Sequence, residues 1–346
     1  MSRLKAERII DRNDSHPPYF VGVDLGGTNI KLGVVDDRGQ PLSCLNIPTE
    51  RERGPQDAME RTAKAIDQVI AEAGLDKDHI AWVGIGTPGT MDVRAGIIIT
   101  PTNLVGWEKF PICEHLSELI ELPVTLANDA SAATYGEYWV GSGRSFNSLI
   151  LLTLGTGIGG GIIIGGLAVN GENGSGAECG HITIDASEGA RMCGCGQPGH
   201  LEAYASATAV IRRTHEAIEV GTDTMLHAKL DAGEELTPKL VAETADEGDE
   251  LCIHIIDETA RYLGIGITSL LHTVDPNGVL LGGAMTFGGN QSPLGRRFLT
   301  LIRREVRNRA LAPLPDRVVI DFASLGSDAG FIGAAGIARW EYGKGA

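Results

Sequence analysis

Basic residues are scarce in this 346-residue sequence: 29 Lys and Arg stand against 45 Asp and Glu, which gives a formal net charge of −16. Such a charge disfavours nucleic acid or an anionic membrane surface as the main partner, because both repel an acidic protein. An anionic small substrate is still compatible with it, because a local site can oppose the global charge. Long apolar runs are also missing: none reaches roughly 18 residues without a charge, so we expect no membrane-spanning segment.

Cysteine is sparse too, with six in the chain and no signal peptide ahead of them. Free thiols are typical of a reducing compartment, so we expect a cytoplasmic protein. Aromatic residues are only 5% of the chain, but an apolar content of 42% is enough for a sizeable core. The length allows two domains of ordinary size.

Strand-like and helix-like patterns alternate along the chain. Residues 19–24 and 30–35 are two apolar runs around a glycine-rich turn, which predicts a β-hairpin. Apolar residues recur with helical spacing over 57–73, and a longer helix is expected over 249–272. Thr237-Pro238 predicts a further helix start, with a capping residue followed by Pro at the first helical position. Strands and helices keep alternating up to a closing helix over 329–340, which indicates an α/β fold with mixed sheets.

The opening hairpin pattern recurs about 130 residues later and suggests two related halves. We expect residues 1–18 to be a disordered or loosely packed extension. Residues 19–127 together with 329–346 should form a smaller first domain, and residues 128–328 a larger second domain, with the boundary near Asn128. Apolar helices such as 249–272 leave room for a subunit interface, so we expect a homodimer or a homotetramer.

Four metal-capable side chains lie within twenty residues of one another. They are His181, Cys193, Cys195 and His200. Thiolate and imidazole in a two-plus-two set suit tetrahedral zinc, and four protein ligands leave no open position for chemistry, so the pattern favours a structural zinc. The alternative is a surface loop with reduced thiols. Glu178 and Glu202 flank the cluster, and a rigid metal loop would hold both carboxylates in place to bind a polar molecule.

Two glycine-rich turns, 26–28 and 155–159, would present backbone N–H groups to phosphate oxygens, with hydroxyls added by Thr28 and Thr156. Residues 155–160 also match the dinucleotide fingerprint G-x-G-x-x-G, but a strand follows where that motif needs a helix. Asp24 would hold Mg²⁺ through water, because magnesium prefers carboxylate and phosphate oxygens. The alternative is that both segments are ordinary β-turns.

Asp129 stands at an expected strand end and helix start. A carboxylate in that position is commonly an N-cap. The alternative is a catalytic base that accepts the proton of an attacking hydroxyl, because the residue follows Asn128 at the expected domain boundary. An aspartate with a pKa near 4 is ionised at neutral pH and ready for that role.

Together these segments resemble the ROK family of sugar kinases and repressors over about residues 19–336. The matching segments are 24–29, 128–129, 154–159, 178–181 and 193–202. The cysteine loop with its two flanking carboxylates is highly specific, whereas the glycine hairpins are shared by the wider group of actin-like, hexokinase-type ATPases. The chain looks most like the bacterial glucokinases of the family. This resemblance implies two actin-like domains that close over Mg²⁺-ATP and a hexose, with phosphate transferred to O6.

The resemblance also implies residue roles. Asp129 matches the catalytic base. The positions that match sugar-binding residues are Asn103, Asn128, Asp129, Glu178, His181 and Glu202. Those that match phosphate and adenosine contacts are Asp24, Gly26, Gly27, Thr28, Gly155, Thr156, Gly157, Gly159, Gly282 and Gly283. His181 would serve twice, with one ring nitrogen on zinc and the other facing a sugar hydroxyl. The family usually has a third cysteine where this chain has His200, which still supplies a fourth ligand, so we expect Zn²⁺ to bind.

Two alternatives are left open. The acceptor is glucose or another hexose, such as N-acetylmannosamine, mannose, allose or fructose, because the paired glutamates do not distinguish epimers. A sugar-responsive repressor is disfavoured, because only about eighteen residues precede the first strand and a DNA-reading domain needs more. We therefore expect a hexose and ATP as partners, and neither nucleic acid nor membrane.

Overall fold

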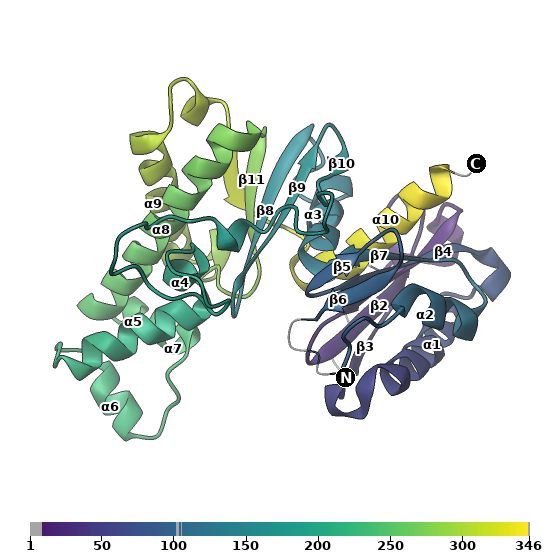
Figure 1. The fold of residues 1–346 in the computed structure, drawn as a ribbon, viewed down its shortest axis with the longest axis horizontal. Helices are drawn as coiled ribbons and strands as arrows, with labels where there is room; N and C mark the ends of the chain where they lie inside the picture. Colours follow the sequence, from purple (N-terminus) through teal and green to yellow (C-terminus); the bar gives the residue numbers. More distant parts are fainter. Residues whose placement is uncertain (1–8, 102–103, 105, 345–346) are drawn as a thin grey trace. The chain divides into compact units, whose positions relative to one another are not determined.

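The computed structural model describes residues 9–101, 104 and 106–344, and the chain divides into two compact units (Figure 1). Unit 1 contains the chain up to Ser145, then Gly161–Ala177, and then the segment from Ser324 onward. Unit 2 contains Phe146–Gly160 and Glu178–Ala323.

This division differs from the expected boundary near Asn128. Helix α3 (Asp129–Trp139) directly follows strand β7 (Val124–Asn128) and packs against helix α10 (Ala329–Lys344) and strand β4 (Ile80–Thr87), so unit 1 keeps it. Residues 161–177 also belong to unit 1, although they were expected in the larger domain. Sequence patterns locate elements but do not show which neighbours an element packs against.

Unit 1 is built on a mixed five-stranded sheet in the order β3-β2-β1-β4-β7. Strands β1 (Tyr19–Leu25) and β2 (Asn29–Val35) form the expected antiparallel hairpin, and β3 (Pro41–Pro48), which the sequence patterns did not reveal, extends it. Strands β1, β4 and β7 run parallel. The remaining elements of unit 1 are helices α1 (Gly54–Glu72) and α2 (Ile112–Ile120) and strands β5 (Thr90–Asp92), β6 (Ile97–Thr100) and β10 (Leu167–Ala168).

Both faces of this sheet are buried. On one face Val21, Val23 and Leu25 pack in a large apolar cluster with α1 and α2. On the other face Phe20 packs with residues of α10, including Phe331. A strand that is covered on both sides needs apolar residues at consecutive positions, which explains the uninterrupted apolar run of β1.

Residues 9–18 are attached to unit 1, which corrects the expected loose extension for that part of it. The Ile10 N–H donates to Pro41 O at 3.0 Å, and the His16 N–H donates to Asp36 Oδ2 at 3.0 Å. Ile10 also packs against the core of unit 1. Residues 1–8 lie outside the described residues.

Unit 2 contains the strands β8 (Ser148–Leu154), β11 (Gly278–Gly282) and β12 (Val319–Phe322), all parallel, from a sheet in the order β10-β9-β8-β11-β12. Strand β9 (Ile158–Ile164) starts in unit 2 and ends in unit 1. It begins earlier than expected, so Gly159 lies in the strand and not in the preceding turn.

The helices of unit 2 pack mainly around α8 (Glu250–Val274), which runs beside α9 (Pro293–Arg309) (Figure 1). The others are α4 (Glu202–Ala205), α5 (Ala207–Glu219), α6 (Leu226–Asp231) and α7 (Pro238–Asp246). Thr237 caps α7 by accepting from the Leu240 N–H at 3.1 Å, as the Thr-Pro start of this helix predicted. Within the described part of the chain, no helix is long and apolar enough to cross a bilayer.

Candidate functional site

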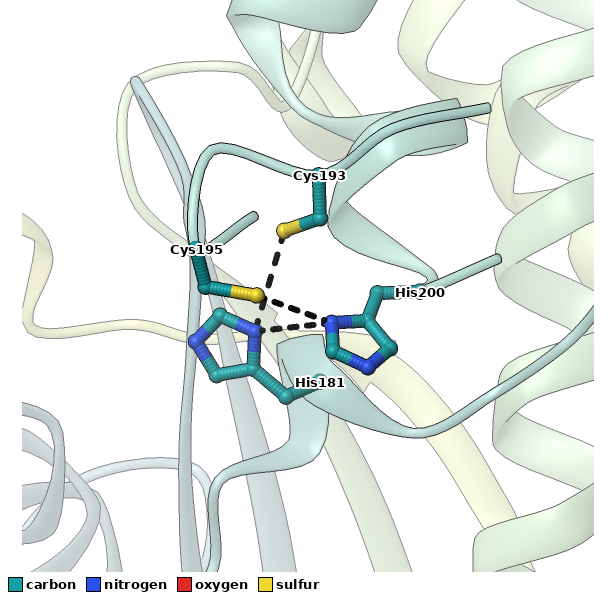
Figure 2. Close-up of side chains that lie close together, drawn as sticks. All are labelled: His181, Cys193, Cys195 and His200. Carbon is teal, nitrogen blue, oxygen red and sulfur yellow. Dashed lines mark hydrogen bonds between the residues drawn. The ribbon is translucent and has the colours of Figure 1, made fainter. Parts of the chain in front are cut away.

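The four predicted metal ligands converge in unit 2 (Figure 2). They are His181, Cys193, Cys195 and His200, and their ligand atoms all lie within 4.8 Å of one another. His181 ends a short turn, and His200 immediately precedes Leu201 and helix α4. The cysteine loop is closed by hydrogen bonds from Gly196 N to Cys193 O at 3.0 Å and from Cys193 N to Gln197 O at 2.9 Å.

The spacing of these atoms fits a tetrahedral ion. The Nδ1 atoms of His181 and His200 are 3.3 Å apart, Cys193 Sγ is 3.8 Å from His181 Nδ1, and Cys195 Sγ is 3.3 Å from His200 Nδ1. A tetrahedron with metal–ligand bonds of about 2.0 to 2.3 Å has edges of about 3.3 to 3.8 Å. His200 therefore lies where it could serve as a fourth ligand, and the donor set matches the chemistry of zinc.

Helices of unit 2 hold the segment from His181 to His200, the metal loop, in place. Tyr204 Oη accepts from the Arg191 N–H at 2.7 Å and donates to Asp185 Oδ2 at 2.6 Å. Arg212 donates to Met192 O at 3.1 Å and to Ala203 O in α4 at 2.7 Å. These contacts join the loop to α4 and α5 independently of any ion.

Glu202 links the metal loop to the second glycine turn. Its Oε2 accepts from the Ile158 N–H at 2.9 Å, and its Oε1 lies 3.4 Å from Cys193 Sγ, which donates to it. A Cβ at Gly157 would lie 2.2 Å from Glu202 Oε2, so glycine is needed there for the carboxylate to reach the turn. The turn itself is closed by a bond from Gly155 N to Gly157 O at 3.0 Å.

The two nitrogens of His181 face different groups. Nδ1 points into the metal cluster (Figure 2). Nε2 lies 4.0 Å from Glu178 Oε2. This geometry is compatible with the expected double role of His181, in which one nitrogen binds a metal and the other faces a substrate hydroxyl.

A cavity of about 590 Å³ opens beside the same glycine turn in unit 2. Gly155 and Thr156 line it together with the start of α7 and the segment that follows β11. The other lining residues that matter here are Ala207, Thr237, Pro238, Ala242, Ala284, Met285 and Phe287. A largely apolar cavity of this size next to backbone N–H groups suits a nucleoside whose phosphates extend toward the turn.

The sequence patterns missed most of this cavity. Thr237 and Pro238 were read only as a helix start, and the residues after Gly283 were not singled out. Gly283 has φ +88° and lies close against the Leu154 backbone, which turns the following residues into the cavity wall. The paired glycines after a buried strand were a signal of a tight turn, but nothing in the sequence joined that turn to α7.

The predicted residues of unit 1 gather where β1 and β7 end. Asn128 caps α3, because its Oδ1 accepts from Ala130 N at 3.0 Å and from Ser131 N at 3.2 Å. Asp129 is therefore not the N-cap, which removes the alternative interpretation of this carboxylate. Its Oδ1 accepts from Ala130 N at 2.8 Å.

Two carboxylates with raised pKa values lie at this end of the sheet. Burial first, and the charge of Asp129 second, raise the pKa of Asp24 to about 7, against the lowering effect of Lys31. Burial also raises the pKa of Asp129, although hydrogen bonds from Asn128 and the backbone lower it in part. Two desolvated carboxylates that act on each other are typical of a site that binds a cation or moves a proton.

The first glycine turn is held by Thr49, which the sequence patterns did not single out. Thr49 Oγ1 donates to Gly26 O at 2.6 Å, and Thr49 N donates to Thr28 O at 2.8 Å. Gly330, at the start of α10, lies against Asp24, because a Cβ there would be 2.2 Å from Asp24 Oδ2. The beginning of α10 therefore defines one wall around this carboxylate.

The structure thus places the predicted residues in two groups, one in each unit. Unit 1 carries the group of Asp24, Gly26, Gly27, Thr28, Asn128 and Asp129. Unit 2 carries the group of Gly155, Thr156, Gly157, Gly159, Glu178, His181, Cys193, Cys195, His200, Glu202, Gly282 and Gly283. Asn103 lies outside the described residues.

Comparisons with known proteins agree with these features. The profile of the ROK family matches residues 20–341. A glucokinase of Halalkalibacterium halodurans is 34% identical over 321 residues, covering 93% of this chain and 95% of the relative, and one of Thermotoga maritima is 32% identical over 320 residues, covering 92% and 97%. The crystal structure of a ROK family glucokinase from Streptomyces griseus, in complex with glucose and AMPPNP, superposes with a TM-score of 0.74 at 34% identity and covers 93% of this chain and 99% of that one.

Proposed function

The chain belongs to the ROK family, with the actin-like α/β fold and mixed sheets that the sequence predicted, and on that premise we propose that it is a glucokinase that transfers phosphate from ATP to O6 of glucose. The observation that carries the proposal is the position of Glu202. This carboxylate adjoins the metal cluster and also accepts from the glycine turn beside the nucleotide-sized cavity. The two glucokinase relatives and the glucose complex of a similar chain support the same activity.

We assign the hexose to the residues that flank the metal loop. Glu178, His181 and Glu202 offer carboxylate and imidazole groups to the sugar hydroxyls, with Asn128 as a further contact. Asn103 completes the proposed set. Charged acceptors give stronger hydrogen bonds to hydroxyls than neutral ones, which favours a polyhydroxylated pyranose.

ATP would place its adenosine in the cavity of unit 2 and its phosphates against the glycine turns. Gly155, Thr156, Gly157 and Gly159 supply the turn in unit 2, next to Gly282 and Gly283. Gly26, Gly27 and Thr28 supply the turn in unit 1. A bound Mg²⁺, held by Asp24 through water, would neutralise charge on the phosphates.

Asp129 is proposed as the base of the transfer. It accepts the proton of the glucose O6 hydroxyl, O6 bonds to the γ-phosphorus, and the bond from that phosphorus to the oxygen bridging to the β-phosphate breaks, so ADP leaves. Phosphoryl transfer has a loose transition state, so the base mainly orients the hydroxyl. The raised pKa of Asp129 makes its carboxylate a better proton acceptor than an exposed aspartate.

Zinc would have a structural role, because the four ligands leave no open coordination position. When bound, it stiffens the loop between Glu178 and Glu202. Burial raises the pKa of the Cys193 thiol to about 12, so metal must displace that proton and its affinity should rise with pH.

We further propose a cytoplasmic enzyme, a homodimer or homotetramer, that binds neither nucleic acid nor membrane. The free cysteines support the compartment, and the net charge of −16 supports the absence of nucleic acid and membrane partners. Light scattering on purified protein measures the oligomeric state directly.

The proposal is tested with a panel of hexoses and Mg²⁺-ATP, scored by kcat/KM. Glucose is expected to rank first. A clearly higher value for N-acetylmannosamine, mannose, allose or fructose would change the substrate and keep the kinase. Absence of phosphate transfer to every hexose would refute the proposal.

A further inference from the structure

The chain passes between the two units at four places: after Ser145, Gly160, Ala177 and Ala323. The first and the last of these connections, after Ser145 and after Ala323, both lie close in sequence to residues that bind the side chain of Glu137. Glu137 lies in the last turns of α3, the helix that begins at Asp129, and its exposed fraction is 0%. A buried carboxylate must be compensated by hydrogen bonds or cations, so its partners show what it stabilises.

Glu137 binds both connections at once. Its Oε2 accepts from Ser142 N at 2.9 Å, from Ser142 Oγ at 3.1 Å and from Ser324 Oγ at 3.1 Å. Its Oε1 accepts from Ser324 N at 2.8 Å and from Leu325 N at 2.6 Å. Ser142 comes just before the first connection and Ser324 directly after the last, so one carboxylate fixes the backbone at both.

The platform that carries Glu137 is rigid. Helices α3 and α10 touch through their backbones, because a Cβ at Gly333 would lie 1.6 Å from Ala132 O. Gly141 passes so close that a Cβ there would lie 2.1 Å from Glu137 Oε2. Such contacts leave little freedom for the carboxylate to shift without moving α3.

Unit 2 fixes the same connections from its own side. Asn277 Oδ1 accepts from Asn147 N at 3.1 Å and from Ser148 N at 3.0 Å, and Asn277 O accepts from Val319 N at 3.0 Å. The chain is thus held at Ser142 and again at Asn147, with only a few residues between. A short segment between two fixed points is the usual form of a hinge.

We propose that Glu137 is a positioning residue for phosphoryl transfer: it ties the helix that carries Asp129 to two connections of the chain and so directs how the units move when substrates bind. It touches neither substrate. Kinases of two units that close on their ligands depend on such hinges for the correct approach of reacting groups, and a misplacement of about 1 Å can cost roughly 100-fold in rate.

This inference rests on the proposed kinase function, but it predicts a different pattern from loss of that function. The groups assigned to glucose and nucleotide in unit 2 do not contact Glu137. Loss of the Glu137 bonds should therefore lower kcat and leave binding of either ligand to the full chain nearly unchanged.

The test variant is Glu137→Gln, which keeps the shape and replaces one acceptor oxygen by an NH₂ donor. If the NH₂ replaces Oε1, the bonds from Ser324 N and Leu325 N are lost. If it replaces Oε2, the bond from Ser142 N is lost and the two serine hydroxyls must accept instead of donate. We expect kcat for glucose to fall roughly 10- to 100-fold, with Kd values for glucose and for a non-hydrolysable ATP analogue, measured by calorimetry, within about twofold of wild type. We also expect the change in radius of gyration on adding both ligands to differ from wild type in solution scattering.

Thr62→Ala is the matched control. Thr62 is buried in α1 of unit 1 and donates to Ala58 O at 2.7 Å, so its loss destabilises the same unit without touching a connection. If Glu137→Gln lowers the Tm as this control does and leaves kcat and the scattering change as in wild type, Glu137 is only a structural residue and the inference is overturned.

If Glu137→Gln does not fold, the double variant Ser142→Ala/Ser324→Ala takes its place. It removes two hydroxyl donors and leaves the carboxylate and its three backbone donors in place. The same split between kcat and Kd, about threefold or more in kcat, is then expected, and its absence overturns the inference. If wild type phosphorylates no hexose, the proposed function fails by itself, and the scattering comparison alone decides the role of Glu137.

Discussion

Glu202 Oε2 accepts a hydrogen bond from the Ile158 N–H at 2.9 Å, which joins the end of the metal loop to the first residue of β9, directly after the glycine turn. The two residues are far apart in the sequence but belong to the same unit. A hydrogen bond to a carboxylate is stronger than one to a neutral group. This contact can therefore hold the proposed sugar-binding segment at a fixed distance from the proposed phosphate-binding segment.

Glu202→Gln should raise the glucose KM roughly 10- to 100-fold, because the amide keeps the shape but loses the charged acceptor. The matched control is Glu188→Gln, an exposed carboxylate of the same loop that makes none of these contacts. Steady-state kinetics at saturating ATP measure the effect. A normal KM in Glu202→Gln would show that this carboxylate does not bind the sugar.

Asp129→Asn should lower kcat by roughly 10² to 10⁴ while glucose affinity stays similar, because the amide cannot accept the O6 proton. Asn128 caps α3, so the helix should keep its start in this variant. Kinetics and calorimetry separate the two effects. Weakened sugar binding with unchanged turnover at saturation would contradict the assignment of Asp129 as the base.

Asp24 should make the stability of unit 1 depend on pH. The folded chain raises its pKa from an ordinary 3.8 to about 7, so its stabilising contribution is complete below 3.8 and is lost as pH rises through 7. Asp24→Asn carries no charge at any pH. In metal-free buffer this variant should therefore gain stability relative to wild type between about pH 4 and pH 8. The gain in the free energy of unfolding is on the order of a few kcal/mol, and it is followed as a rising difference in Tm. A Tm difference that is the same at every pH would rule out the raised pKa.

Cys195→Ser should remove the metal and raise the glucose KM, because Glu178 and Glu202 lose the stiffened loop between them. Metal content per chain is measured by elemental analysis, and Cys44→Ser, a change outside the cluster, should retain both metal and KM. Stoichiometric zinc together with a normal KM in Cys195→Ser would refute the scaffold role.

Ala242→Phe should fill part of the cavity in unit 2 and raise the ATP KM roughly tenfold or more, with the glucose Kd unchanged. Ala228→Phe, on an exposed position of α6, is the control for the added ring. Equal ATP KM values in the two variants would mean that the nucleotide binds elsewhere.

Much of the fold was visible in residue patterns. The hairpin of β1 and β2, the long helix α8 and the Thr-Pro start of α7 followed from apolar period and turn residues, which are local properties. Strand β3 was missed because its mixed apolar and polar residues give no strong alternation. The extent of unit 1 was also missed, because packing of α3 on α10 joins residues from opposite ends of the chain.

The sequence by itself determined the family, the fold class and the set of metal-capable residues, since these depend on residue types and short spacings that survive without coordinates. Only the tertiary structure decided that Asn128 and not Asp129 caps α3, that α7 and the segment after β11 line one cavity with Gly155, and that Glu137 binds two connections. Each of these depends on which distant segments meet, and that is set by burial and backbone contacts of the whole chain, which no local pattern encodes.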